Sequence, residues 1–106
     1  MPNVRLAGRY AKSLLDLAIE QNQLDVVYDD MKYFQAVCAQ SHEFVNVLRS
    51  PIIKADQKNA IIHAVIKDAV NVLSLSFIVL LVKKSRESAL PEIATAFIEQ
   101  YNALKG

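Results

Sequence analysis

The stretch LSLSFIVLLVKKS, residues 73–85, decides the fold of this chain. Seven of the eight residues from Leu75 to Val82 are apolar, and Ser76 is the exception. A helix built from this run is apolar almost all the way round, whereas a surface helix needs an apolar stripe only somewhat wider than about 100°. Something must therefore cover the second side of this helix.

Length and composition limit what that covering can be. The chain has 106 residues, and 53% of them are hydrophobic against 22% charged, which predicts one domain (residues 1–106) with a packed core. The apolar segment 69–82 is too short to span a bilayer, which takes roughly 20 residues. The net charge of +1 provides no overall field for nucleic acid or an anionic membrane. We expect no nucleic-acid partner and no direct membrane contact.

Helical periodicity runs through the whole sequence. The chain contains no Asn-Gly or Asp-Gly turn between alternating apolar runs, so no hairpin is indicated. Apolar residues recur at helical spacing in residues 3–21 and 23–40. Ser41 is suited to cap a short helix over residues 42–48, which Ser50-Pro51 must end, because the residue before proline avoids helical angles. Three further helices follow, so the sequence predicts an all-α fold, a compact six-helix bundle.

The last three helices are placed by caps and apolar stripes. Asp56 suits the cap or first turn of the fourth helix, the fifth is expected to start near Ser74, and Ser85 or Ser88 can cap the sixth, with Pro91 in its first turn. The expected stripes are Ile62, Val65 and Ile66 on the fourth helix, and Ile93, Ala94, Phe97, Tyr101 and Leu104 on the sixth.

Two helices carry more apolar surface than one core contact needs. The core face of the first helix is Ala7, Ala11, Leu14, Leu15 and Ala18, and a second stripe adjoins it, made of Leu6, Tyr10, Ser13 and Leu17. The two stripes together span about 200° of the helix. On the fifth helix Ser74, Ile78, Leu81 and Val82 share one side, with Leu75 beside them, while Ser76, Val79, Leu80 and Lys83 point the other way.

Periodicity leaves two interpretations of the second stripes open. Both can be buried against other helices of the same chain, as is usual for a helix that is apolar all round. Alternatively, they lie side by side and form a groove for an amphipathic helix of another protein. In the second case the candidate partner-binding residues are Leu6, Tyr10, Ser13, Leu17, Ser76, Phe77, Val79, Leu80, Lys83 and Lys84.

Three segments resemble one known family. AGRYAKSLLDLA (7–18) resembles the Ala-x-Arg-Tyr-Ala-x-x-Leu-x-x-Leu-Ala pattern of the delta subunit of F-type ATP synthases, called the oligomycin-sensitivity-conferring protein in mitochondria. LRSPIIKADQK (48–58) is similar to the family's turn into its fourth helix, and KKSRESALPEIATAF (83–97) to its segment leading into the sixth. The three matches occur in the family's order over the whole chain.

The resemblance implies a function and its partners. It identifies the chain as the N-terminal domain of a non-catalytic subunit of the peripheral stalk, or stator. In the family this domain binds the N-terminal helix of an alpha subunit between helices one and five, which places contacts on Tyr10, Ser13, Leu17, Ser76, Leu80 and Lys83. The b subunits are bound through a C-terminal domain that this chain lacks. The expected location is peripheral, at the cytoplasmic face of the bacterial inner membrane, with membrane contact only through the complex.

The sequence departs from the family pattern at two positions. Ser85 stands where the family usually has glycine, so the turn between the fifth and sixth helices is expected to be strained if it needs a positive φ. Glu87 replaces a usual leucine.

Neither a metal site nor a catalytic site is expected. Cys38 and His42 are four residues apart, but zinc takes about four ligands and no complementary pair is near in the sequence. Asp25, Asp29 and Asp30 fall on the predicted polar face of the second helix, where early acidic residues favour the helix dipole. Nucleotide-binding and metalloprotease motifs are absent from the sequence. We expect no enzyme activity and no cofactor.

One alternative class is a six-helix interaction adaptor of the death-fold type. Such adaptors associate with each other through charged patches, so self-association would be sensitive to salt. The near-neutral charge and the surplus apolar stripes favour the groove instead. The basic cluster KKSR (83–86) can close the fifth helix through its dipole, or meet acidic side chains that flank a partner helix.

Overall fold

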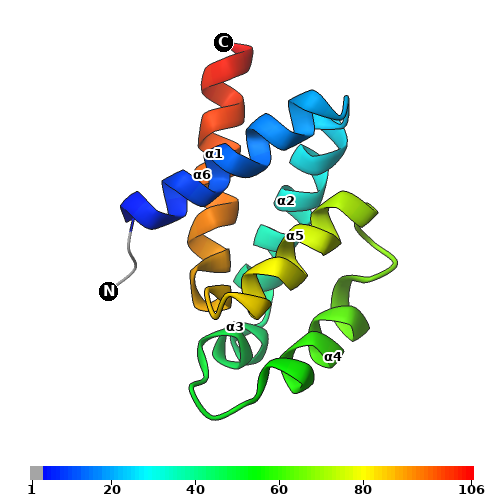
Figure 1. Ribbon diagram of the computed structural model, residues 1–106, viewed down its shortest axis with the longest axis vertical. Helices are drawn as coiled ribbons and strands as arrows, with labels where there is room; N and C mark the ends of the chain where they lie inside the picture. Colours follow the sequence, from blue (N-terminus) through cyan, green and yellow to red (C-terminus); the bar gives the residue numbers. More distant parts are fainter. Residues whose placement is uncertain (1–3) are drawn as a thin grey trace.

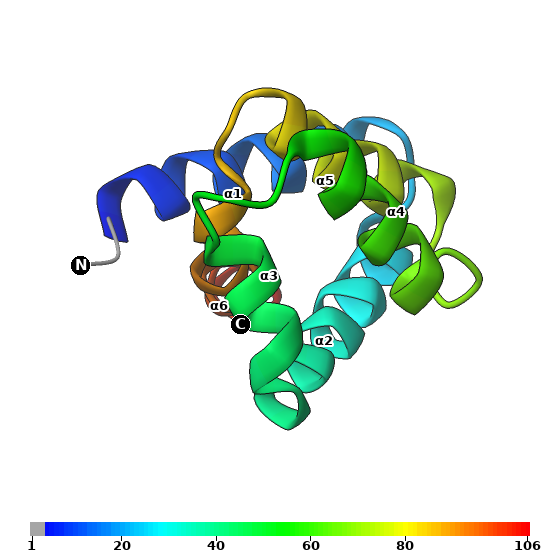
Figure 2. The same ribbon diagram turned by 90° about the horizontal axis from the view of Figure 1, so that it is seen from below.

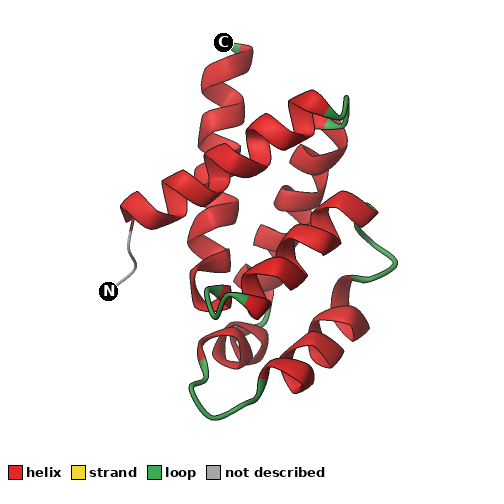
Figure 3. Cartoon of the chain, viewed as in Figure 1, coloured by secondary structure: helices red, strands yellow, loops and turns green. Residues whose placement is uncertain are grey.

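The computed structural model describes residues 4–106 and confirms the all-α prediction. Its elements are α1 (Val4–Glu20), α2 (Leu24–Gln40), α3 (His42–Arg49), α4 (Ala55–Ile66), α5 (Val72–Lys83), the 3₁₀ helix η1 (Glu87–Ala89) and α6 (Leu90–Lys105). Short loops join these helices, and no strand occurs in residues 4–106 (Figure 3). Residue 3, where the predicted first helix begins, lies outside the described residues.

The helices form two sides of a bundle. α6 packs mainly against α1 and α2, while α1 and α5 lie on the same side of the molecule, in front of α6 and α2 as Figure 1 is drawn. Figure 2 shows the same grouping from below, with α3 and α4 at the end near the viewer. The largest fully buried side chains come from all six helices, and they include Leu14, Phe34, Leu48, Ile62, Ile78 and Phe97. One continuous core therefore holds the bundle together.

Aromatic contacts join α2 to α3 and to α6. Phe34 of α2 meets Phe44 of α3 edge to face, with ring centroids 5.8 Å apart. Tyr28 of α2 stacks on Tyr101 of α6 at 3.8 Å, and the Tyr101 hydroxyl donates a hydrogen bond to Asp25 Oδ1 at 2.6 Å. Such pairs add roughly 0.5–1.5 kcal/mol beyond their buried area. They fix α2 against α3 and α6.

Several predicted helix ends are confirmed. The Ser41 hydroxyl caps α3 by accepting a hydrogen bond from the Phe44 backbone N–H at 3.1 Å. α3 ends at Arg49, because Ser50 before Pro51 has an extended backbone. Asp56 lies in the first turn of α4, and Pro91 occupies the first turn of α6.

Two predicted starts differ from the structure. α5 begins at Val72, two residues before Ser74, because the Asn71 side chain caps it by accepting from the Leu73 N–H at 2.9 Å. Neither Ser85 nor Ser88 caps α6, which starts after Ala89 and makes no side-chain cap hydrogen bond. The turn of η1 precedes α6 and directs the chain into it, so no separate cap is needed there.

Some predicted core positions are also wrong. Val65 and Leu104 are exposed, since α4 contacts the bundle mainly through α5 and Leu104 lies in the last turn of α6. Asp30, expected on the polar face of α2, is buried, because the N-terminal end of α5 packs over it. Ile62 and Ile66 are fully buried as predicted, as are Ile93, Ala94 and Phe97.

Candidate protein-binding interface

The second stripes of α1 and α5 face the surface on the same side of the bundle. The two helices run in opposite directions, so the end of α5 lies toward the start of α1 (Figures 1 and 2). Neither stripe is buried in the chain's own core as a whole: Leu6, Tyr10, Leu17 and Val79 are half-buried, and Leu80 is 45% exposed. Full burial of both stripes within the chain is therefore excluded.

The α1 half of this interface has a defined shape. Leu6, Arg9, Tyr10 and Ser13 line an open depression of about 290 Å³. Ser13 is exposed, and its hydroxyl donates to the Arg9 carbonyl at 3.1 Å, so this polar group already has a partner within the helix. A small side chain without an unsatisfied donor allows another helix to approach closely. The sequence prediction missed Arg9, although its position one residue before Tyr10 places it beside the stripe.

The α5 half is formed by exposed side chains and one buried support. Ser76, Lys83 and Lys84 are exposed beside Leu80. Phe77 differs from the other candidate residues, because only 8% of it is exposed and it belongs to the core. Its inclusion in the binding set is corrected: on a helix that is apolar all round, the pattern shows no boundary between the core face and the second stripe.

The start of α5 is held by a buried carboxylate. Asp30 of α2 is 6% exposed, and its Oδ2 accepts hydrogen bonds from the Ser74 hydroxyl at 2.7 Å and from the Asn71 backbone N–H at 2.8 Å. The carboxylate thus lies at the N-terminal end of α5, where the helix dipole favours negative charge. Both bonds span more than 40 residues of sequence, so no local pattern indicates them.

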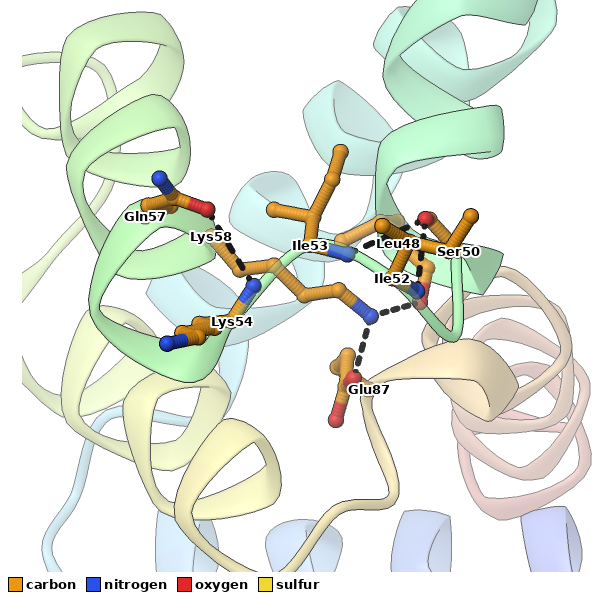
Figure 4. Close-up of polar contacts among 8 residues, drawn as sticks. All are labelled: Leu48, Ser50, Ile52, Ile53, Lys54, Gln57, Lys58 and Glu87. Carbon is orange, nitrogen blue, oxygen red and sulfur yellow. Dashed lines mark hydrogen bonds and ion pairs between the residues drawn. The ribbon is translucent and has the colours of Figure 1, made fainter.

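The 3₁₀ helix η1, which follows the end of α5, is held by a buried ion pair (Figure 4). Lys58 of α4 is 3% exposed, and its Nζ donates to Glu87 Oε2 of η1 at 2.5 Å and to the Leu48 carbonyl of α3 at 3.0 Å. The carbonyl belongs to the last turn of α3, where a cation is favoured. Glu87 Oε1 is buried without a hydrogen-bond partner among the described residues. The pair joins three elements at one point.

The loop beside this ion pair is ordered by its own side chains. The Ser50 hydroxyl accepts from the backbone N–H groups of Ile52 at 3.1 Å and Ile53 at 3.3 Å (Figure 4). The Gln57 side chain accepts from the Lys54 N–H at 3.3 Å at the start of α4. The segment between α3 and α4 therefore presents Lys58 to Glu87 in a fixed geometry.

Ser85 adopts a positive φ, which is the conformation in which strain was expected for a residue other than glycine. Its φ is 60°, directly after the C-cap of α5. Ser85 N–H donates to the Val82 carbonyl at 3.0 Å, and Arg86 N–H to the Leu81 carbonyl at 2.8 Å, which is the hydrogen-bond pattern of a Schellman turn. A serine in this conformation is strained relative to glycine. The family departure therefore leaves the turn in place at an energetic cost.

Comparison with known proteins identifies the relatives. The sequence pattern of the family described as ATP synthase delta (OSCP) subunit matches residues 6–106. The chain belongs to this family. It is 42% identical over 106 residues to ATP synthase subunit delta of Cytophaga hutchinsonii, covering 100% of this chain and 58% of that protein. The corresponding protein of Amoebophilus asiaticus is 38% identical over 104 residues, covering 98% of this chain and 56% of the relative.

A third member of this family gives the same picture. ATP synthase subunit delta of Chlorobaculum parvum is 40% identical over 97 residues, which cover 92% of this chain and 54% of that protein. The chain thus spans little more than half the length of these relatives.

Other candidate sites are weaker. Residues 4–106 contain no cluster of three or more potential metal ligands. Cys38 is half-buried, and burial raises the pKa of its thiol to about 11, with smaller opposing effects of Arg49 and Glu92. A thiol with a raised pKa is a poor nucleophile and a poor metal ligand at neutral pH. None of the helices described in residues 4–106 has the length and apolarity that crossing a bilayer requires.

Proposed function

We propose that this delta-family domain belongs to the non-catalytic peripheral stalk of the F-type ATP synthase and binds the N-terminal helix of an alpha subunit between α1 and α5. The observation that supports it is the pair of apolar stripes that stay at the surface on one side of the bundle. An amphipathic helix laid along them would cover the half-buried Tyr10 and the exposed Leu80. Such a contact would cover the second side of α5.

The mechanism is static binding. A stator holds the catalytic head in place while a rotor turns, which demands a contact that is released slowly. Dissociation rates depend mainly on well-packed apolar and aromatic anchors, whereas rim charges act mainly on association. Tyr10 and Leu80 are the anchors, and Phe77 supports them from the core. We also propose that the b subunits bind elsewhere in the full-length subunit and that the domain meets the membrane only through the complex.

The test is a titration of the chain with a cognate alpha-subunit N-terminal peptide of roughly 20 residues, about five helical turns. NMR shifts are expected at residues 6–17 and 76–84. Tyr10→Ala or Leu80→Asp should weaken binding by about 2 kcal/mol or more, roughly thirtyfold, without loss of the fold. Ile52→Ala removes an apolar side chain that is 86% exposed, from the loop between α3 and α4, and serves as the control.

Three results would count against the proposal. Unchanged affinity in both anchor variants, measured by calorimetry, would remove these residues from the interface. Shifts that map to α3 and α4 instead would move the binding site to the other end of the bundle. Salt-sensitive self-association without peptide binding would favour the adaptor class instead.

A further inference from the structure

The two ends of the proposed interface differ in charge. Because α1 and α5 are antiparallel, the start of α1 and the end of α5 lie at the same end of the interface (Figures 1 and 2). Five exposed basic residues belong to these two helix ends: Arg5 and Arg9 in the first turns of α1, and Lys83, Lys84 and Arg86 at or just after the end of α5. None of them forms an ion pair with any residue from 4 to 106. We call this group the basic end.

The opposite end is close to neutral. There α1 finishes with Glu20, and α5 begins shortly after Lys67 and Asp68. Between the two ends, Lys12 and Asp16 neutralise each other through an ion pair at 2.8 Å. The basic end therefore differs from the rest of the interface by its uncompensated charge, and not only by its number of charged residues.

The basic side chains flank the apolar stripes rather than lying apart from them. Arg9 lines the depression with Leu6, Tyr10 and Ser13. Arg5 lies one turn before Arg9, and Lys83 and Lys84 lie one turn after Val79 and Leu80. Like charges four residues apart on a helix repel each other by about 0.2–0.5 kcal/mol. A partner that brings carboxylates to this end relieves that repulsion.

We propose that the basic end sets the direction of the bound helix. This inference rests on the proposed function, and it adds the chemistry of the partner: an amphipathic helix that carries acidic side chains at the one end that lies over Arg5, Arg9, Lys83 and Lys84. Apolar anchors give affinity in either direction, because side chains of similar size can fill the same groove reversed. Charge complementarity rejects the reversed helix, since it leaves both sets of charges unpaired.

The test uses two designed peptides of about 20 residues, long enough for five turns. They share one apolar stripe and one composition, but the acidic residues lie in the N-terminal half of the first peptide and in the C-terminal half of the second. A spin label is attached at the acidic end of each. Both labels are expected to broaden NMR signals of residues 5–9 and 83–86, so that the two peptides bind in opposite directions. Broadening at residues 17–20 and 72–76 by either label would overturn the proposal.

Charge reversal gives an independent measurement. The double variant Lys83→Glu, Lys84→Glu is expected to slow association with both peptides about tenfold at low salt, and the difference should shrink at high salt because exposed charges are screened. The control is Lys54→Glu, Lys67→Glu, which changes the net charge equally at exposed positions outside the basic end. Equal effects of the two double variants would show a general charge effect and contradict the proposal.

The cognate alpha-subunit peptide separates this inference from the proposed function. If that peptide shifts residues 6–17 and 76–84 while the designed pair shows no preferred direction or no binding, the interface stands and the directional role of the basic end is wrong. If the cognate peptide leaves both helices unshifted, the proposed function fails, and the labelled pair alone decides whether the basic end recruits acidic helices.

Discussion

Different kinds of polar contact fix the chain at the start of α5 and just after its end. A buried charged side chain acts near each end: Asp30 holds the start of α5 directly, and Lys58 holds η1, which follows the end of α5. Asp30 is satisfied by neutral donors, the Ser74 hydroxyl and a backbone N–H of Asn71. Lys58 is satisfied by a full opposite charge on Glu87 and by the Leu48 carbonyl. The first anchor depends on hydrogen bonds and a helix dipole, and the second on charge neutralisation.

This difference determines what a single substitution does. Removing a neutral donor from Asp30 leaves a carboxylate that keeps its second donor and the positive end of α5. Removing Glu87 leaves an ammonium group that is 3% exposed with only a carbonyl beside it. Breaking a buried ion pair by deleting one partner is far more costly than replacing both partners with apolar residues. The end of α5 near η1 is thus the more vulnerable of the two.

The largest effect is expected for Glu87→Leu. We expect the free energy of unfolding to fall by about 3–5 kcal/mol, because Lys58 loses its countercharge. Urea denaturation measures the change. The double variant Lys58→Met, Glu87→Leu should recover most of the loss, since it also removes the buried, unpartnered Oε1 of Glu87. A single variant as stable as the parent chain would mean that Lys58 reaches water without Glu87.

A smaller effect is expected at the other anchor. Asp30→Ala should lower the free energy of unfolding by about 2 kcal/mol, because Ser74 and the Asn71 N–H lose a charged acceptor. The matched control is Asp29→Ala, an exposed neighbour on the same helix, whose effect should stay within about 0.5 kcal/mol. If Asp30→Ala proved more damaging than Glu87→Leu, the contrast between the two anchors would be reversed.

Neither anchor could be predicted from the sequence, and the reason is distance along the chain. Asp30 meets residues 41 and 44 positions away, and Lys58 meets Glu87 29 positions away. Helical periodicity shows which face of a helix is apolar, but it does not show which polar residue a neighbouring helix will cover. Asp30 therefore looked like one more residue on a solvated face.

What periodicity did predict was the set of helices and the surplus apolar surface. The fold prediction of six helices is confirmed, because amphipathic spacing, Ser41 and Ser50-Pro51 are local signals. The second stripe of α1 could be recognised, since charged residues border it on one side. On α5 no charged residue separates the faces, so Phe77 was assigned to the surface although it is buried. The partner of this surface remains a prediction.

A stabilising change is expected in the turn that follows α5. Ser85 and Asn22 are the non-glycine residues in 4–106 with positive φ, at 60° and 56°. Ser85→Gly should raise the free energy of unfolding by about 1 kcal/mol, because an L-residue other than glycine is strained in this conformation. Asn22→Gly should give less, because asparagine tolerates the left-handed region better than serine does. The absence of a gain for Ser85→Gly in thermal or urea denaturation would show that Ser85 is not strained, and equal gains in the two variants would show that Asn22 is strained as much as Ser85.

The smallest effect is expected at Cys38, whose pKa is changed mainly by burial and not by one charged partner. Burial raises the pKa of its thiol to about 11, Arg49 lowers this pKa, and Glu92 raises it. A rise of two units cuts the thiolate fraction near pH 8 about a hundredfold, and the higher nucleophilicity of a more basic thiolate returns about tenfold. Alkylation of the native chain by iodoacetamide should therefore be about tenfold slower than in urea.

The pH profile and two variants complete this comparison. Because the folded pKa exceeds the unfolded value, the neutral thiol stabilises the fold below about pH 9, and this contribution is lost as the pH rises toward 11. The native alkylation rate should keep rising up to that pH. Arg49→Gln should slow alkylation further and Glu92→Gln should speed it, since the two side chains form an ion pair at 2.7 Å beside the thiol and act on it with opposite sign. A native alkylation rate that levels off near pH 9 would show that Cys38 is solvated like a free thiol. In that case burial would exclude water from Asp30 and Lys58 but not from Cys38.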